Sequence, residues 1–168
     1  IRIFYDIDLG KKAKINEIVF LGDKKIKDRK LRNVITSEIA RPWKFISNKV
    51  YLDKDRINLD KRLLSNYYKN LGFYNAKIEN SFVEFKDNGS FKLIYNVNAG
   101  EKFTFNKLDL IIPTDFDSKY FIEIKELLSE LENELYSLEN IDKILKKIDK
   151  IALSKQYEFI DATVSENV

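Results

Sequence analysis

The chain has 168 residues, and its 30 basic and 27 acidic side chains leave a net charge of only +3. Lysines alternate with Asp and Glu along the whole length, which argues against a nucleic-acid-binding module, because such modules gather basic residues on one face. The sequence contains neither Cys nor His, and this excludes disulfides, the usual zinc sites and His-based catalysis. No spacing of ionisable residues suggests a catalytic pair, so we do not expect an enzyme.

An internal repeat sets the expected domain organisation. Residues 4–18 match residues 94–108 at an offset of 90 positions, with Tyr, Gly, Lys and Asn recurring and the apolar positions in step. A repeat of this length has the scale of a small domain and is too long for a solenoid. The match predicts the end of a preceding module at 1–10, a complete module at 11–100 and a second module at 101–168 that is truncated at its C-terminus.

The complete module begins with a strand and a short helix. Residues 14–21 predict a strand that is apolar on both faces and is ended by Gly22 and Asp23. Asp28 is the expected N-cap of a helix that stops before Pro42. The long connection that follows carries apolar side chains, which we expect to close the end of the core: Trp43, Phe45 and Ile46.

A longer helix and a β-hairpin complete this module. Asp53 or Asp55 caps the helix, whose apolar residues recur at spacings of three and four, and Gly72 is its expected C′ residue. Two β runs follow at 76–85 and 91–97, joined by the turn sequence Asp-Asn-Gly at 87–89. Crossover rules place the last strand between the other two. The predicted fold class is α+β, with a three-stranded mixed sheet covered by two antiparallel helices.

The second module repeats the order without its last strand. Residues 103–112 predict a strand, and two helices follow at 118–131 and at 138–153, the latter capped by Ser137. A strand from Phe159 to Val168 ends the chain. We therefore expect an open sheet, with which residues 1–8 of another molecule pair by strand exchange.

The stretch from 51 to 78 carries a family signature. It resembles the POTRA (polypeptide-transport-associated) domains, whose pattern is matched by Asp60, Tyr67, Tyr68, Gly72, Phe73 and Ala76. The strand that ends at Gly22, the connection around Trp43 and the glycine at Gly100 that closes the module are similar to the same family. The tandem order resembles the third and fourth POTRA domains of outer-membrane β-barrel assembly factors, preceded by the tail of the second.

The resemblance implies a function and a location. POTRA domains of this kind form a periplasmic scaffold, the soluble part of an outer-membrane protein with a C-terminal membrane β-barrel. The scaffold receives unfolded outer-membrane β-barrel proteins and docks accessory lipoproteins, and no cofactor or metal is implied. Two-partner secretion transporters and other polypeptide-translocating outer-membrane channels carry the same domains, so they remain an alternative.

The strand at 76–86 is the candidate partner-binding element, because the predicted order leaves it at a sheet edge whose unpaired backbone groups template an incoming strand. Its alternation breaks, since Val83 and Phe85 are apolar in the opposite phase to Ile78 and Phe82, and we expect a β-bulge near Phe82. Either the bulge protects the edge from aggregation or it shapes a docking site. The candidate contacts are Ile78, Asn80, Phe82, Val83, Glu84 and Phe85.

Two other groups of residues have simpler interpretations. Asp53, Asp55, Asn58 and Asp60 hint at a calcium loop but lack its central Gly and closing Glu, so helix capping and a solvated face explain them. Tyr67 and Tyr68 lie near the end of an amphipathic helix, where packing on its own core is favoured over stacking with nucleic acid.

Overall fold

The computed structural model describes residues 14–43, 47–157 and 162–168. The chain divides into two compact units: Ile1–Ser65 with Lys77–Ala99 form unit 1, and Asn66–Ala76 with Gly100–Val168 form unit 2. The expected fragment at 1–10, and the strand exchange that depends on it, lie outside the described residues. The module boundaries drawn from the repeat stay predictions.

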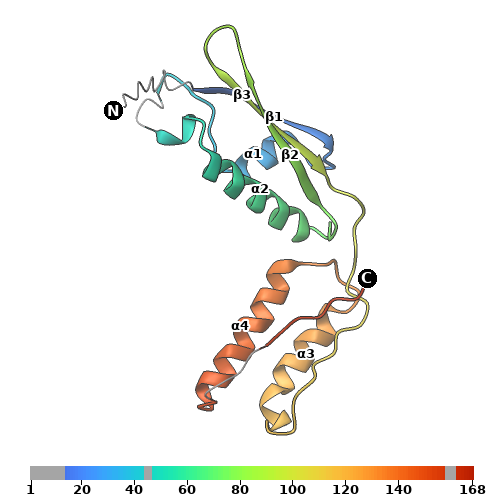
Figure 1. The fold of residues 1–168 in the computed structure, drawn as a ribbon. Coiled ribbons are helices and arrows are strands. Elements are labelled where there is room, and N and C mark those ends of the chain that lie inside the picture. The colour runs from blue at the N-terminus through green and yellow to red at the C-terminus, as the bar shows by residue number, and fades with distance from the viewer. Residues whose placement is uncertain (1–13, 44–46, 158–161) are drawn as a thin grey trace, which may run out of the picture. The chain divides into compact units, whose positions relative to one another are not determined.

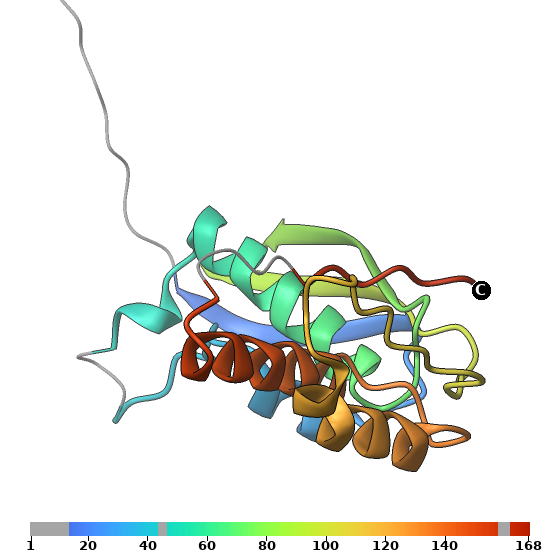
Figure 2. The ribbon, with the colours of Figure 1, turned by 90° about the horizontal axis from the view of Figure 1, so that it is seen from below.

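The sheet of unit 1 has the predicted topology. Its strands are β1 (Ile15–Asp23), β2 (Lys77–Phe85) and β3 (Phe91–Asn98), in the order β1-β3-β2. The central strand β3 runs parallel to β1 and antiparallel to β2. Figure 2 shows β2 in green and β1 in blue on opposite sides of the yellow-green β3.

Helices α1 (Asp28–Val34) and α2 (Lys54–Lys69) lie on one side of this sheet (Figure 1), and a short 3-10 turn, η1 (Asn48–Val50), precedes α2. The strand residues facing them are buried, and so are Leu31 and Leu64 of the helices. β1 carries apolar residues on both faces, as predicted, but only one of these faces is covered. Because the helices cover one face only, Leu21 is 51% exposed.

In the first two helices, α1 and α2, the ends follow the predicted signals in two cases out of three. Asp53 caps α2, since its Oδ1 accepts a hydrogen bond from the Arg56 N–H at 2.7 Å. Asp28 does not cap α1: it is the first helical residue, Lys27 is the N-cap, and the Asp28 carboxylate instead pairs with Lys24. That carboxylate still lies in the first turn, where the helix dipole favours a negative charge.

Gly72 ends α2 as predicted. The Gly72 N–H donates to the Lys69 carbonyl at 3.2 Å, and the Phe73 N–H donates to the Tyr68 carbonyl at 3.1 Å. These two bonds form a Schellman motif, which requires a residue with positive φ at its C′ position. Gly72 supplies it with a φ of +94°.

The connection around Trp43 differs from the prediction. Trp43 is 68% exposed and lies under the Arg41 guanidinium at 5.5 Å from the ring centroid. The expectation that Trp43 closes the core is therefore wrong, because its ring packs against an exposed cation and not against the apolar interior. Phe45 and Ile46 lie outside the described residues.

Asp60 is fully buried, which corrects the expectation that it lies on a solvated helix face. Its carboxylate accepts hydrogen bonds from the Thr36 N–H at 2.6 Å, the Thr36 hydroxyl at 2.7 Å, the Ser37 N–H at 3.2 Å and the Tyr95 hydroxyl at 2.8 Å. These donors come from the loop after α1 and from β3. The carboxylate thus joins α2 to both.

Unit 2 contains a 3-10 turn and two helices. They are η2 (Ser118–Phe121), α3 (Ile122–Leu131) and α4 (Leu138–Ser154). Both predicted helices are confirmed, and the Ser137 hydroxyl caps α4 by accepting a hydrogen bond from the Asn140 N–H at 3.3 Å.

The two predicted strands of unit 2 are not formed in its described residues. The start of the 103–112 segment pairs its backbone with the connection between the helices, where Phe105 N–H donates to Glu134 O and Tyr136 N–H donates to Phe103 O. The rest of that segment and residues 162–168 have no strand ladder among the described residues. A strand requires a paired neighbour, and apolar alternation alone does not supply one.

The alternation nevertheless predicts which side chains are buried. Leu108, Leu110 and Ile112 pack on the core formed by Phe121, Ile124, Leu128 and Ile148, whereas Ile111 is exposed. The 103–112 segment therefore covers the helix pair as a strand would, without the hydrogen bonds of a sheet.

Asp60→Ala is expected to lower the free energy of unfolding by at least about 3 kcal/mol, because it leaves buried donors without an acceptor. Asp55→Ala, at an exposed position of the same helix, is expected to cost less than about 1 kcal/mol. Urea unfolding followed by circular dichroism measures both. Equal losses in the two variants would contradict the role given to Asp60.

Tyr95→Phe is expected to make the free energy of unfolding fall less steeply as the pH rises above 10. Burial, together with the bond to Asp60, raises the pKa of the Tyr95 hydroxyl well above its usual value of 10. The unfolded chain releases this proton near pH 10 while the folded chain keeps it, so the associated stability is complete below pH 10 and is lost as the pH rises further. The loss approaches about 1.4 kcal/mol per pH unit. Parallel stability profiles of the two proteins between pH 9 and 11 would refute this.

Candidate partner-binding strand

The β2 strand lies at an edge of the three-stranded sheet, as the sequence predicts. Of its candidate contact residues, Ile78 is buried, whereas Phe82, Val83 and Phe85 are 54%, 40% and 65% exposed. Asn80 is exposed, and the Glu84 carboxylate lies 3.7 Å from Lys92 Nζ. The strand is thus anchored in the core by Ile78 and presents its second half at the surface.

The predicted irregularity is present but lies closer to the start of the strand. The pairing shifts between Ile78, which is opposite Val97, and Asn80, which is opposite Asn96. Glu79 is the extra residue, and its carboxylate oxygens accept hydrogen bonds from the Asn96 and Asn98 side-chain amides at 3.2 Å each. These two amides explain why the bulge lies at Glu79 and not near Phe82.

The bulge brings Ile78, Val83 and Phe85 onto one face of the sheet, the face covered by the helices. Paired residues on neighbouring antiparallel strands share a face, and Val83 is opposite the buried Leu93. Phe82 is opposite Ile94 and therefore lies on the other face. Beyond Ile78 the covered face loses its helical neighbours, and the Phe85 ring packs on the Phe91 ring at 5.3 Å between centroids.

Two hydrogen bonds determine which backbone groups of β2 point outward. The Lys86 N–H donates to Ser90 O across the hairpin at 2.9 Å, and the Phe91 N–H donates away from β2, to Lys14 O at 2.8 Å. Antiparallel pairs alternate between hydrogen-bonded and non-hydrogen-bonded residues. The N–H and C=O groups of Ser81, Val83 and Phe85 therefore point away from β3, toward the open edge.

The opposite edge of the sheet differs, because outward carbonyls of β1 already have donors. Ile15 O accepts from the Ala40 N–H at 2.7 Å, Ile18 O from Arg32 Nη1 at 3.5 Å, and Phe20 O from Lys24 Nζ at 3.1 Å. The sequence does not predict these three hydrogen bonds, because their donors belong to α1 and its flanking loops. An added strand would meet fewer satisfied groups at β2 than at β1.

The other residues singled out in the sequence are structural in this fold. Tyr68 and Phe73 are buried and form an edge-to-face ring pair, with Tyr67 packed on Tyr68. Ala76 is buried at the start of β2. Gly22 has a φ of +85°, and a Cβ added there would lie 2.3 Å from Val97 O. Within the described ranges, no group of acidic side chains could hold a metal ion.

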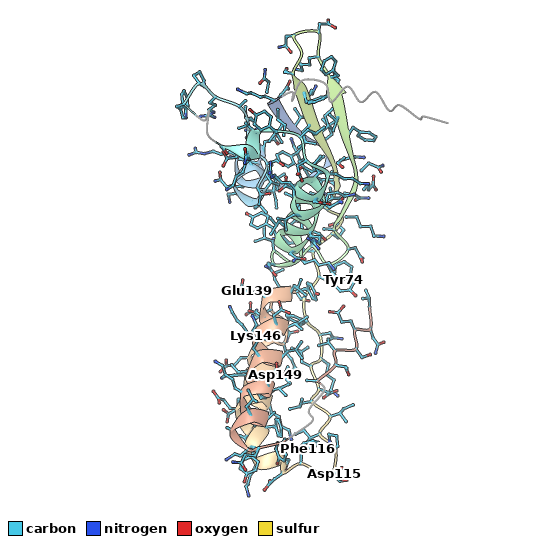
Figure 3. The ribbon with its side chains drawn as sticks, turned by 60° about the vertical axis from the view of Figure 1, so that its left-hand side comes forward. Tyr74, Asp115, Phe116, Glu139, Lys146 and Asp149 are labelled. Atoms are coloured by element: carbon cyan, nitrogen blue, oxygen red, sulfur yellow. The ribbon has the colours of Figure 1, made fainter. Side chains whose placement is uncertain are left out.

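One cluster of ionisable groups in unit 2 resembles a site but is explained by packing. The hydroxyls of Tyr74 and Tyr136 both donate to the Glu166 carboxylate, at 2.8 and 3.2 Å, and their rings pack edge to face. Figure 3 shows Tyr74 and Glu139 near the same end of unit 2. The bond to Glu166 raises the pKa of Tyr74, and burial raises the pKa of Tyr136. Both hydroxyls therefore keep their protons at neutral pH and donate to the carboxylate, as structural bonds do.

Comparison with known proteins decides the family. The family model for POTRA, described as "Surface antigen variable number repeat", matches residues 13–100. The chain belongs to the POTRA family. The match covers β1, α1, η1, α2, β2 and β3, and so includes the β2 edge.

Curated relatives point to one kind of POTRA protein. The outer membrane protein assembly factor BamA of Neisseria meningitidis serogroup B is 23% identical over 159 residues, which are 94% of this chain and 20% of that protein. The BamA of Buchnera aphidicola is 25% identical over 160 residues, which are 94% of this chain and 25% of that protein. The chain thus spans a quarter or less of the length of these relatives.

Solved structures show the same fold. The POTRA3-5 structure of BamA from Haemophilus influenzae matches with a TM-score of 0.64 and 20% identity, over 86% of this chain and 54% of that one. A BamA structure from Haemophilus ducreyi that lacks POTRA domains 1-3 matches with a TM-score of 0.52 and 12% identity, over 83% and 24%. These matches confirm the resemblance to BamA POTRA domains. In the described residues no helix combines the length and apolarity needed to span a membrane.

Proline substitutions are expected to distinguish the β2 residues whose N–H groups point outward from those whose N–H groups bond β3. Val83→Pro removes an outward N–H and spares the ladder, so the unfolding free energy falls by less than about 1.5 kcal/mol. Phe82→Pro removes an N–H that bonds β3 and is expected to cost about 3 kcal/mol or more. Urea unfolding of both variants measures the difference. If Val83→Pro proves the more damaging, the assignment of the outward groups is wrong.

Proposed function

We propose that this chain is a periplasmic polypeptide-binding scaffold of an outer-membrane protein assembly machine. It receives unfolded β-barrel proteins, and an incoming strand adds to the sheet at β2. The proposal is supported by membership of the POTRA family and by relatives named as outer membrane protein assembly factors. A membrane β-barrel elsewhere in the full-length protein belongs to the same proposal.

One observation carries the binding mode: β2 ends in a stretch whose backbone groups point outward at Ser81, Val83 and Phe85, while β1 has donors on its outward carbonyls. Backbone hydrogen bonds supply affinity in strand addition without requiring a particular sequence. This suits a scaffold that receives many different chains. The β2 edge is also the site at which we place the docking of accessory lipoproteins.

Other classes of function have less support. The hydroxyls of Tyr74 and Tyr136 donate structural hydrogen bonds to the Glu166 carboxylate, so we propose no enzymatic activity. Several surface lysines form ion pairs with acidic side chains, as Lys86 does with Glu17. Such pairing does not favour binding of nucleic acid, which requires a clustered basic face. A two-partner secretion transporter or another polypeptide-translocating channel is the alternative within the family.

A backbone NMR titration tests the binding mode. The probe is a synthetic peptide with the sequence of one strand of an outer-membrane protein, added to the 168-residue chain. We expect the largest amide shifts at 80–86, because these residues gain hydrogen bonds. Val83→Pro is expected to abolish the shifts, whereas Val83→Thr, which keeps the N–H, retains binding within about fivefold.

Two results would count against strand addition. Shifts confined to α1 and α2 would place the peptide on the helices and make this unit a dock of another kind. Unchanged binding by Val83→Pro would show that the outward N–H of residue 83 has no part in it.

A further inference from the structure

The side chains of β2 continue two rows that cross the whole sheet. On the helix side, Ile18 of β1 is paired with Leu93 of β3, and Leu93 with Val83. On the opposite side, Val19 is paired with Ile94, and Ile94 with Phe82. Each row therefore contains three apolar residues and ends at the β2 edge.

Both rows end in side chains that water still reaches. Ile18 and Leu93 are buried, but Val83 at the end of their row is 40% exposed, and Phe82 at the end of the other is 54% exposed. Val83 and Phe82 are consecutive, so apolar surface is exposed on both faces of the sheet at one point of the edge. Phe85 extends the helix-side surface by two residues.

Polar side chains lie next to the residues of this apolar surface and between them. Ser81 and Asn80 precede it, and Glu84 lies between Val83 and Phe85. The Glu84 side chain is more than half exposed, and its 3.7 Å separation from Lys92 Nζ leaves it available to a second cation. The edge thus presents an acidic group on the same face as Phe82.

We propose that β2 selects strands with two adjacent apolar residues, one for each face of the sheet. This inference rests on the proposed strand addition and names the chemistry of its ligand. Read from the N-terminus of an antiparallel strand, the preferred pattern is apolar, basic, apolar, apolar, opposite Phe85, Glu84, Val83 and Phe82 in turn. Directly opposed apolar pairs and opposite charges stabilise neighbouring strands.

A strand that strictly alternates apolar and polar residues places its apolar side chains beside only one of the two apolar rows. Transmembrane β-strands alternate apolar and polar residues, whereas strands buried on both faces have adjacent apolar residues. Within an unfolded client, β2 therefore selects segments that interrupt the alternation. The bulge at Glu79 determines which of the two side chains lies on the helix side, since without the phase shift Val83 would not lie on the same face as Ile78.

Three synthetic peptides test this selection on the 168-residue chain. Each has ten residues, blocked ends, terminal lysines and threonine elsewhere. The parent carries the core valine, lysine, valine, phenylalanine, and two others replace either the second valine or the phenylalanine with threonine. We expect each replacement to weaken binding about three- to fivefold, measured by isothermal titration calorimetry, because each removes one cross-strand pair.

Double-mutant cycles assign each pair. Phe82→Thr is expected to weaken the parent peptide about three- to fivefold and to leave the peptide without phenylalanine nearly unchanged. Val83→Thr is expected to behave in the same way toward the peptide without the second valine. Equal affinities of the three peptides, or losses that add without coupling, would overturn the selection.

Proline variants separate failure of the selection from failure of strand addition. If Val83→Pro or Phe85→Pro abolishes binding while the three peptides bind equally, strand addition stands and the selection is wrong. If both proline variants remain folded by circular dichroism and bind the parent peptide normally, strand addition itself is wrong. Two proline positions are used so that misfolding of one variant does not decide the outcome.

Discussion

The buried carboxylate of Asp60 is the interaction on which unit 1 depends. Burying a charge in a protein core costs several kcal/mol unless hydrogen bonds replace the lost water. Here neutral donors do so: two backbone N–H groups and the hydroxyls of Thr36 and Tyr95. Since these donors lie on the loop after α1 and on β3, the carboxylate is satisfied only when helix, loop and sheet are all in place. Asp60 therefore makes the helix layer and the central strand cooperative.

The fixed position of β3 also allows β2 to keep its outer side open for a partner. Because β3 is central, it bonds β1 on one side and β2 on the other, and its Tyr95 is held by Asp60. A strand that is fixed on one side only can keep its second side open without loss of order, provided that its neighbour is rigid. The two sheet edges differ accordingly: Lys24 and Arg32 donate to carbonyls of β1, whereas the outward groups of Ser81, Val83 and Phe85 have no backbone partner among the described residues.

Local signals in the sequence predict most of unit 1, because each specifies one backbone geometry. Gly72 supplies the positive φ of a helix end, and crossover rules leave only one place for β3. The burial of Asp60 could not be predicted in this way, since it depends on hydrogen-bond donors more than twenty residues away in sequence. The same limit explains the bulge: its existence follows from the broken alternation, but its position at Glu79 depends on amides of β3. In unit 2, alternation predicts burial at 108–112 and not the missing ladder.

The bulge at Glu79 has an evolutionary consequence. It separates Ile78, the one buried residue of β2, from the residues after it, whose side chains are exposed or half-buried. Substitutions that exchange only the exposed side chains of Phe82, Val83 and Phe85 leave Ile78 and its packing untouched, so they can change what the edge prefers at little cost to folding. Selection on recognition and selection on stability then act on separate residues of one strand, and homologous scaffolds can diverge in their clients while keeping a common fold.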